Sequence, residues 1–379
     1  VGAVGNAAGH AVFAGDYAYV LQNREIDGDD IELSIVDMSD ATSPEMVMLP
    51  NVQTGGLGKS TALNDVNFAR RGLIRAVGSY LYISSATGFQ VIDVAEPSQA
   101  QTLVTHTVLG QAYGMAHHPY EPIVYAATNT WAGKGAVSAI DVEVVGNISS
   151  QVHAVALETE TYDVAIGSGN RLYLVAADLS LQALDITEPL VPSVVDVLAG
   201  IDTPTAGAET IVAVQGGLAV VASSLDGYRI VDITDSAEMV VVYEDASPAE
   251  ISAMTFFEGY LLLATRWEGL VVVDLTLPTS PEVVATIEVG GTPRGVHVVG
   301  HRVYVSTSSH FLKVIDLTLP CTDLDLCTLD TCHVDGGCDF GEQVDCDDLD
   351  PCTSDSCNPG AGCSFEEIPG CVPGVVGGP

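Results

Sequence analysis

The sequence has few basic residues. Its 12 Lys and Arg stand against 50 Asp and Glu, which gives a formal net charge of −38 at pH 7. A protein that follows nucleic-acid phosphates needs a basic surface, so this balance excludes that class of partner. It also argues against docking on anionic lipid. No run of about 18 apolar residues occurs, so we expect no membrane insertion.

Cysteine is missing from most of the chain. Residues 1–320 contain none, whereas all nine cysteines lie within residues 321–371. Such a density without the CxxC spacing of zinc sites is typical of a disulfide framework, and therefore of an oxidising compartment. We expect two parts, residues 1–320 and 321–379, and an extracellular or cell-surface location.

The first part contains a repeated pattern. Apolar residues make up 47% of the chain, enough for a sizeable core. A short apolar run that ends in aspartate recurs seven times along residues 1–320. Repeats of about 40–50 residues that are rich in β-branched side chains indicate propeller blades. The seven runs end at Asp37, Asp93, Asp141, Asp185, Asp232, Asp274 and Asp316.

Each repeat contains further strand signals around its aspartate. A second apolar strand precedes it, and before most of these stands a third that ends in glycine, such as His10–Gly15. A fourth follows a proline-rich turn, as in Pro281–Val289. The units predict an all-β fold: a seven-bladed β-propeller of four-stranded blades, followed by a small disulfide-rich tail. We expect the recurrent aspartate to accept hydrogen bonds from turn N–H groups, because seven copies around a disc cannot meet at one substrate.

These units resemble the LVIVD repeat, a β-propeller family of mainly secreted and surface proteins. The resemblance spans residues 1–320 and rests on the Ile-Val-Asp, Val-Ile-Asp and Val-Val-Asp runs and on phrases such as Asp16–Val20. It implies a fold and no activity. The third unit departs from the pattern, because Val142 and Glu143 stand where other units have a proline turn.

The seventh unit lacks a fourth strand at its own end. Residues 1–5 align with the end of an outer strand, Ile287–Gly291, so we expect the N-terminus to complete the last blade. About four residues are available, and a strand usually has about 5–6. A poorly capped sheet edge is a template for pairing with another chain, although a few residues can also suffice to close it.

The tail repeats one cysteine pattern. Its spacing is C-x5-C-x4-C-x5-C-x7-C, with two units and the start of a third. The pattern is similar to the short CTDC-type cysteine repeat of extracellular proteins, which implies a spacer and names no ligand. A unit this short cannot bury a useful core, so disulfides must hold it. The expected disulfide residues are Cys321, Cys327, Cys332, Cys338, Cys346, Cys352, Cys357, Cys363 and Cys371.

Nine is an odd number of cysteines. Either one thiol stays free or one disulfide joins two chains. Cys371, which opens the incomplete third copy, is the natural odd member. The spacing leaves the connectivity within the tail open.

The tail is also strongly acidic. Residues 321–371 hold thirteen Asp and Glu and no Lys or Arg. Clustered carboxylates suit Ca²⁺, which takes six to eight oxygen ligands, so Ca²⁺ is the candidate cofactor. The alternative is a solvated acidic surface. The candidate metal ligands are Asp323, Asp325, Asp330, Asp348, Asp350 and Asp355.

Several motifs for chemistry are weak or absent. Gly55–Thr61 resembles a phosphate loop, but Gln53 stands where that pattern needs glycine. His117 and His118 could bind a metal ion, but adjacent residues of a strand point to opposite faces and would chelate poorly. We interpret the two as loop histidines that precede Pro119. No GxSxG or HExxH occurs. Side chains that the inner strands could offer to a site are His10, Tyr113, Asp163, Arg294 and His297.

Two surface features complete the sequence. Residues 51–72 are expected to form a long loop that carries Lys59, Arg70 and Arg71 and is a plausible contact site. Asn147 begins an N-glycosylation sequon.

The sequence favours a non-enzymatic extracellular protein with a structural or adhesive role, a subunit of a surface assembly or filament. The tail would serve as spacer or connector, and the partner would be the same chain or another surface protein. The end at Pro373–Gly377 could add as a strand to a neighbour. Two alternatives stay open: a propeller enzyme that acts on carbohydrate, and a monomeric surface module that binds a ligand.

Overall fold

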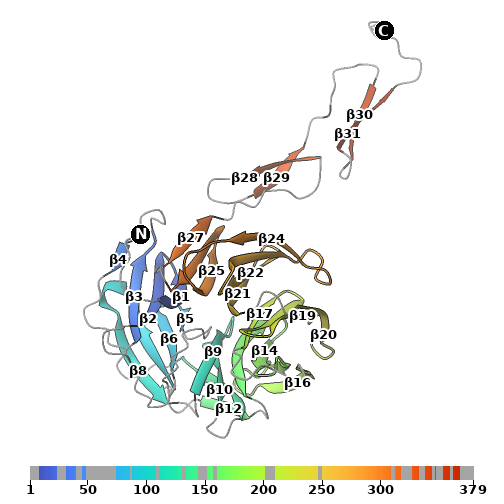
Figure 1. Cartoon of the computed structure of the whole chain (residues 1–379). Helices are drawn as coiled ribbons and strands as arrows, with labels where there is room; N and C mark the ends of the chain where they lie inside the picture. The colour runs from blue at the N-terminus through green and yellow to red at the C-terminus, as the bar shows by residue number, and fades with distance from the viewer. Residues whose placement is uncertain are drawn as a thin grey trace. The chain divides into compact units, whose positions relative to one another are not determined.

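The computed structural model contains seven sheets in residues 8–316 and two hairpins that follow them (Figure 1). The chain divides into two compact units, residues 1–298 with 303–315 and residues 299–302 with 316–379. The structure describes residues 8–23, 31–39, 45–47, 74–85, 88–107, 111–129, 134–143, 152–156, 160–200, 210–245, 250–308, 312–316, 327–332, 338–343, 346, 353–358 and 362–367.

Each of the first six sheets has four antiparallel strands in chain order, and each is one blade. The first three blades are β1 (Ala8–Ala14), β2 (Tyr17–Asn23), β3 (Ile31–Asp37) and β4 (Glu45–Val47); β5 (Ile74–Val77), β6 (Tyr80–Ser85), β7 (Gly88–Asp93) and β8 (Gln101–Thr107); and β9 (Gln111–His117), β10 (Ile123–Asn129), β11 (Gly135–Asp141) and β12 (Val152–Ala156). The next three are β13 (Thr161–Gly167), β14 (Arg171–Ala176), β15 (Leu181–Asp185) and β16 (Ser193–Leu198); β17 (Thr210–Gln215), β18 (Leu218–Ser223), β19 (Gly227–Asp232) and β20 (Val240–Asp245); and β21 (Ile251–Phe257), β22 (Tyr260–Thr265), β23 (Gly269–Asp274) and β24 (Glu282–Ile287).

The seventh blade has three described strands, β25 (Pro293–Val299), β26 (Arg302–Thr307) and β27 (Lys313–Asp316). The predicted seven-bladed propeller is therefore confirmed. The prediction that residues 1–5 supply a fourth strand to this blade lies outside the described residues. The one helical segment among the described residues is the 3-10 turn η1 (Pro97–Gln99), and no helix there is long and apolar enough to cross a membrane.

Burial changes from the middle strands to the outer strand of a blade. Every residue of β10 is buried, whereas five of the six residues of β24 are exposed. A middle strand packs against neighbouring blades on both faces, so an unbroken apolar run such as Ile123–Ala127 replaces the alternation of a one-sided sheet. This explains why the repeats read as short continuous apolar runs.

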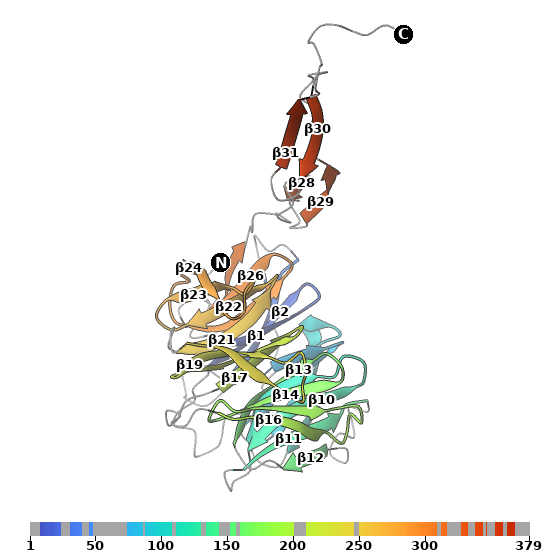
Figure 2. The ribbon, with the colours of Figure 1, turned by 90° about the vertical axis from the view of Figure 1, so that its right-hand side faces the viewer.

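The core lies between adjacent blades. One cluster joins Tyr125 of the third blade to Leu174 of the fourth. Similar clusters join the first blade to the second, the second to the third, the fourth to the fifth and the fifth to the sixth. The first and seventh blades also pack together, through Val20 of β2 and Tyr304 of β26. Phe13 of β1 stacks on His297 of β25 with ring centroids 4.8 Å apart. Side-chain packing thus joins the first blade to the last. Figure 2 shows the backbone of the propeller from the side.

The C-terminal unit contains two β-hairpins. The first pairs β28 (Thr328–Cys332) with β29 (Cys338–Gln343), and the second pairs β30 (Thr353–Asn358) with β31 (Gly362–Glu367). In the register of the two hairpins, Cys332 lies opposite Cys338 and Cys357 opposite Cys363. These pairs are the third and fourth cysteines of their sequence repeats, so the hairpins are structural repeats as well as sequence repeats.

Candidate functional site

The inner strands bring the charged residues Arg75 and Asp163 near one another. The Nε of Arg75, on β5, donates a hydrogen bond to the carbonyl oxygen of Met115 on β9, 2.7 Å away. Burial lowers the pKa of the Arg75 guanidinium, and the nearby carboxylate of Asp163 opposes that shift. Arg75 therefore connects the second blade to the third by a hydrogen bond and to the fourth by charge.

Backbone hydrogen bonds fix the carboxylate of Asp163. Its Oδ1 accepts a hydrogen bond from the N–H of Val164, and its Oδ2 accepts one from the N–H of Val212 on β17. The side chain lies over Gly114 of β9, where a Cβ atom would come within 2.8 Å of Asp163 Cγ. Gly114 is thus required by the close approach of Asp163. Together these contacts tie the inner strands of four consecutive blades.

The other inner-strand candidates also contribute to packing. Tyr113 is buried and meets Tyr162 edge-on, with ring centroids 5.1 Å apart. His297 stacks on Phe13 of the first blade. Arg294 lies on β25, and His10 lies on β1, but the structure does not describe the His10 side chain. The structure brings Asp163 together with Arg75, a residue that the sequence analysis missed. The one signal in the sequence was that Arg75 stands between apolar residues at the start of a strand, where a charged side chain is unusual.

The inner strands offer little for acid–base chemistry. Among the seven described inner strands, β1, β5, β9, β13, β17, β21 and β25, Asp163 is the sole carboxylate. Its two oxygens already accept backbone hydrogen bonds. Glycoside hydrolysis generally uses two carboxylates flanking the bond that breaks. The described inner strands supply one carboxylate, that of Asp163.

The recurrent aspartates form turns, as predicted. In six blades the carboxylate Oδ1 accepts a hydrogen bond of 2.7–2.9 Å from the N–H two residues later. The residue between them donates its own N–H to the turn before the second strand, as Ile233 does to Gly217. In the seventh blade, Asp316 accepts a hydrogen bond from Arg302, and the residues that follow it lie outside the described part of the chain. The six turn-forming residues are Asp37, Asp93, Asp141, Asp185, Asp232 and Asp274.

The histidine pair before Pro119 has a structural role at His118. This side chain is buried, and its Nδ1 accepts hydrogen bonds from the N–H groups of Tyr120 and Glu121, at 3.3 and 3.0 Å. Burial lowers the pKa of His118, and the nearby Glu121 opposes the shift. His118 is thus a neutral acceptor at pH 7 that shapes the loop, as we interpreted it. The interpretation was wrong for His117, which is the last residue of strand β9 and pairs with Val124 of β10.

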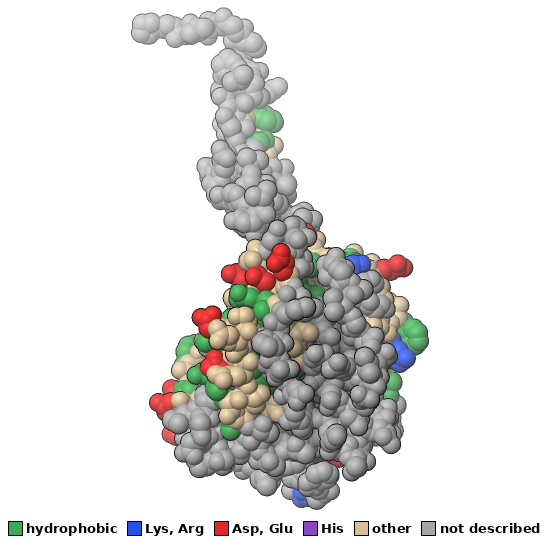
Figure 3. All heavy atoms as spheres, turned by 90° about the vertical axis from the view of Figure 1, so that its left-hand side faces the viewer, with side chains coloured by type: hydrophobic (Ala, Val, Ile, Leu, Met, Phe, Trp, Pro, Cys, Tyr) green, Lys and Arg blue, Asp and Glu red, His purple; other side chains and the backbone are tan. Residues whose placement is uncertain are grey.

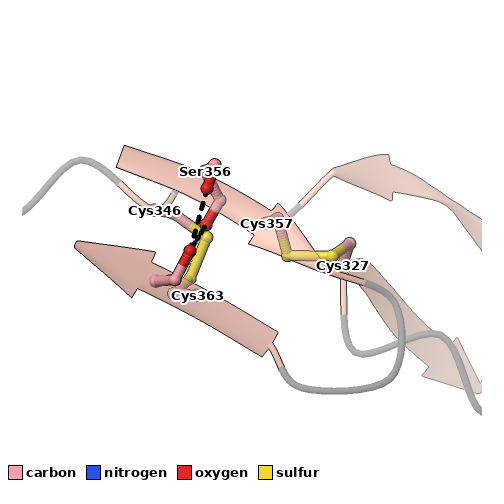
Figure 4. Close-up of a disulfide and its surroundings, with 6 residues drawn as sticks. Cys327, Cys346, Ser356, Cys357 and Cys363 are labelled. Carbon is pink, nitrogen blue, oxygen red and sulfur yellow. Dashed lines mark hydrogen bonds between the residues drawn. A yellow bond between two sulfur atoms is a disulfide. The ribbon is translucent and has the colours of Figure 1, made fainter. Parts of the chain in front are cut away.

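Two disulfides define the tail, and Figure 4 shows them side by side. One joins Cys346 to Cys363 across 17 residues, within the second repeat. The other joins Cys327 to Cys357 across 30 residues, from the first repeat to the second. The Sγ atoms of Cys346, Cys357 and Cys363 all lie within 4.8 Å of one another. All three sulfur atoms form disulfides, so they are not thiolate ligands for a metal ion. The cluster is the place where the two disulfides lie close together.

The hairpin of the second repeat is otherwise polar. Ser356 and Ser364 face each other across β30 and β31 and share a hydrogen bond of 2.8 Å (Figure 4). Both serines are exposed, and Phe365 beside them is also exposed. The disulfides take the place of an apolar core here, as the sequence predicts for a unit of this size.

Most of the proposed calcium ligands lie outside the described residues. Asp330 is in β28 and Asp355 is in β30, at equivalent places in the two hairpins, although their side chains are not described. The other four, Asp323, Asp325, Asp348 and Asp350, are not described. Asn147, the 51–72 loop and the 373–377 segment also lie outside the described part of the chain.

The fold and the disulfide-bonded hairpins define a β-propeller protein with cysteine-rich repeats. Comparison with family models identifies both repeats. LVIVD repeats match residues 5–52, 73–104, 206–244 and 254–288. The Dictyostelium (slime mold) repeat matches residues 320–340 and 345–368. No curated protein matches the chain.

Solved structures share the propeller fold. The WD40 beta propeller domain of Doa1 matches 82% of this chain and 92% of its own length, with 12% identity and a TM-score of 0.54. The computationally designed Ika8 protein matches 82% of this chain and 96% of its own, with 12% identity and a TM-score of 0.52. At this identity the likeness concerns the fold alone. The propeller repeats and the disulfide-bonded cysteine repeats fit an extracellular protein.

Proposed function

We propose that this chain is a non-enzymatic structural subunit of an extracellular assembly. In it the propeller is a rigid body and the cysteine-rich tail is a connector between subunits. The observation that carries the proposal is the Cys327–Cys357 disulfide, which makes two consecutive hairpins one covalent unit. Disulfides between repeats can hold such a tail in a defined conformation although it has no hydrophobic core. A tail of this kind can fix the spacing between the subunits that it connects.

The outer strands of the propeller support association. Val194, Val195 and Val197 on β16 are all exposed, and Val283 and Val284 on β24 are exposed as well. Both strands are last in the order of their sheets, so their outer edges have no ladder partner within the described sheets. Exposed apolar edge strands favour pairing with another chain.

The charge of the protein sets a condition on that association. Acidic side chains recur over the described part of the face in Figure 3, whereas Lys and Arg are sparse there. Subunits with a net charge of −38 repel one another unless cations screen them. Ca²⁺ bound by the tail carboxylates would supply that screening, and it is the cofactor we propose.

Electron microscopy of the purified native protein tests the proposal. We expect filaments or sheets at millimolar Ca²⁺, and loss of those assemblies after EDTA or a reductant. Separate particles the size of a single chain under every condition would contradict an assembly role. That result would favour the surface module that binds a ligand, with the 51–72 loop as its first candidate contact.

A screen of polysaccharide hydrolysis addresses the remaining alternative. Since the described inner strands hold one carboxylate, we expect no activity on any polysaccharide. Hydrolysis that disappears in the Asp163→Asn variant, with an unchanged thermal midpoint, would instead identify an enzyme.

A further inference from the structure

An exposed tryptophan stands in the turn between β22 and β23. Trp267 has an exposed fraction of 73%, and it is one of two tryptophans in the chain. Tryptophan is highly buried on average, because its ring brings a large apolar area to a core. The turn between β18 and β19 in the preceding blade has the same length and places the smaller Leu225 at the equivalent position. The propeller turn itself therefore does not require an indole here.

Hydrogen bonds fix the backbone on both sides of Trp267. The Oγ1 atom of Thr265 accepts a hydrogen bond from the N–H of Glu268, 3.2 Å away, and the hydroxyl donates one to the carbonyl oxygen of Gly269. Gly269 has a φ of +87°, and a Cβ atom there would clash with the carbonyl oxygen of Ile287. The turn thus presents Trp267 from a defined backbone.

Arg266 orients the indole ring. The guanidinium carbon Cζ of Arg266 lies over the ring of Trp267, 4.9 Å from its centroid. Glu250, the residue before β21, holds Arg266 at two points: its Oε2 lies 3.0 Å from Nη1, and its carbonyl oxygen accepts a hydrogen bond from the Arg266 N–H. Glu250 has a φ of +63°, which is uncommon for a residue other than glycine. Backbone outliers of this kind cluster where a binding site needs a fixed geometry.

This arrangement leaves one face of the indole available to a ligand. Arg266 covers one face, and the exposed fraction of 73% places the other in solvent. The neighbours of Trp267 in the turn, Arg266 and Glu268, are charged and exposed. The centre of a protein–protein interface is instead apolar and desolvated, with a polar rim around it. A single aromatic plane between hydrogen-bonding groups fits a small polar ligand that has one apolar face.

We propose that Trp267 is the platform of a binding site for neutral oligosaccharides. A pyranose ring presents C–H groups on one face, which pack against an aromatic ring, and hydroxyl groups around its edge. The carboxylate of Glu268 accepts hydrogen bonds from those hydroxyls, and the guanidinium of Arg266 donates to them. The net charge of −38 repels anionic saccharides, so the site selects the neutral class.

This site goes beyond the proposed structural role and does not depend on it. It binds a saccharide without breaking a bond, and a monomer binds in the same way as an assembled subunit. One small platform gives weak binding. Repetition of the platform along an assembly raises the overall avidity for a polysaccharide without any new contact.

Isothermal titration calorimetry of the full chain tests the site. The neutral probes are cellohexaose and chitohexaose, and hexagalacturonate is the anionic comparison. We expect at least one neutral probe to bind the wild type, and hexagalacturonate to bind more weakly than that probe. Trp267→Ala should weaken the binding about tenfold or more, because it removes the stacking surface. Trp267→Tyr keeps an aromatic plane and should retain most of the affinity.

Two further variants separate the platform from its support and from aromatic exposure in general. Tyr120→Ala is the matched control, because Tyr120 is an exposed aromatic residue in a turn of another blade, and it should leave the affinity unchanged. Arg266→Gln should weaken binding less than Trp267→Ala does and should change the tryptophan emission spectrum. Arg266→Lys keeps a cation and should restore much of both. Unchanged thermal midpoints in all variants exclude an effect on folding.

Several results would overturn the inference. Neither neutral probe may fail to bind at its highest soluble concentration, since failure of both removes the site. Equal affinity of the wild type and Trp267→Ala removes the platform, and hexagalacturonate binding as tightly as the neutral probes removes the ligand class. Binding of hexalysine that is lost in Trp267→Ala, without binding of a neutral probe, would identify a cationic partner instead. Absence of filaments by microscopy contradicts the structural role and leaves this site standing.

Discussion

At the scale of single residues, close contacts on the inner strands hold neighbouring blades in place. Asp163 accepts backbone hydrogen bonds from two blades and lies over Gly114 of a third. Arg75 reaches the carbonyl oxygen of Met115 beside that glycine. Each contact involves a backbone atom, so these positions tolerate little change in the size of the side chain.

Replacement of Gly114 by alanine tests this packing. The added Cβ would meet the Asp163 carboxylate and backbone, so Gly114→Ala should reduce stability by about 1–3 kcal/mol, the usual cost of overpacking. Differential scanning calorimetry measures it. Gly217→Ala is the matched control, because its new Cβ has Thr234 Oγ1 as nearest neighbour at 3.4 Å, and its midpoint should stay close to that of the wild type. Equal midpoints for both variants would show that Asp163 can move aside.

The turn aspartates make stability depend on pH. Hydrogen bonds from the side chain and backbone of Thr276 lower the pKa of Asp274 below its ordinary value of 3.8. A carboxyl group whose pKa is lower in the folded state stabilises the fold only while ionised. Its contribution is complete above about pH 4 and disappears as the pH falls through the folded pKa.

The variant Asp274→Asn isolates this effect. Its melting temperature should lie below that of the wild type at pH 7, because the variant loses a hydrogen bond to a charged acceptor. Such a bond contributes about 1.5–3 kcal/mol at most, and less at a half-exposed site such as this one. The difference should shrink as the pH falls below about 4. Glu268→Gln, an exposed position in the turn between β22 and β23, is the control and should leave the melting curve unchanged. A difference that is constant from pH 7 to pH 3 would mean that the charge plays no part.

The sequence predicted some of these residues and missed others for a physical reason. The turn role of Asp232 and Asp274 could be predicted because donor and acceptor are two residues apart. Arg75 and Asp163 come from blades separated by an entire blade, and their proximity depends on the curvature of the ring. A periodic pattern places residues on strands but does not report which strands become neighbours across the ring.

At the scale of elements, the blade is the unit that the sequence predicts best. The short runs ending in Asp became the third strand of every blade, because a middle strand buried on both faces requires continuous apolar residues. The disulfide pairing was left open by the spacing, and two bonds in the structure resolve it in part. Cys327 bonds to a residue in the next repeat, a choice that spacing within one repeat cannot reveal.

Ring closure by the N-terminus remains a prediction at this scale. If residues 1–5 supply the outer strand of the seventh blade, deletion of residues 1–7 should lower the thermal midpoint, since that deletion removes backbone hydrogen bonds along β27. Deletion of residues 373–379 removes the same number of residues from the other end and should have no effect on the propeller. If the two deletions behave alike, the packing of Phe13 on His297 closes the ring without a shared strand.

At the scale of the whole molecule, reduction of the disulfides should affect the cysteine-rich tail and leave the propeller unchanged. All nine cysteines lie beyond residue 320. A reductant should therefore leave the propeller's cooperative melting transition unchanged and make the tail sensitive to protease. Limited proteolysis with and without reductant, followed by calorimetry of the resistant fragment, measures both. A lower propeller midpoint in reductant would indicate that the tail stabilises the blades.

The charge imbalance also acts on the whole molecule. Because a net charge of −38 favours expansion, raising the ionic strength from about 0.01 M to about 0.15 M shortens the screening length from about 30 Å to about 8 Å and should raise the melting temperature. Thermal melts at a series of NaCl concentrations measure this. Choline chloride is the control for a specific effect of Na⁺. A melting temperature independent of salt would mean that the acidic groups are already neutralised by bound cations.

The long span of the Cys327–Cys357 bond has a mechanical consequence. Tension applied along the tail passes through the two sulfur atoms and bypasses the residues between them, a sequence separation of 30. At about 3.3–3.6 Å per extended residue, the bond withholds roughly 100 Å of contour length. In the oxidised tail, opening of the β28–β29 hairpin therefore adds no length, whereas reduction lets all the residues between Cys327 and Cys357 extend under tension.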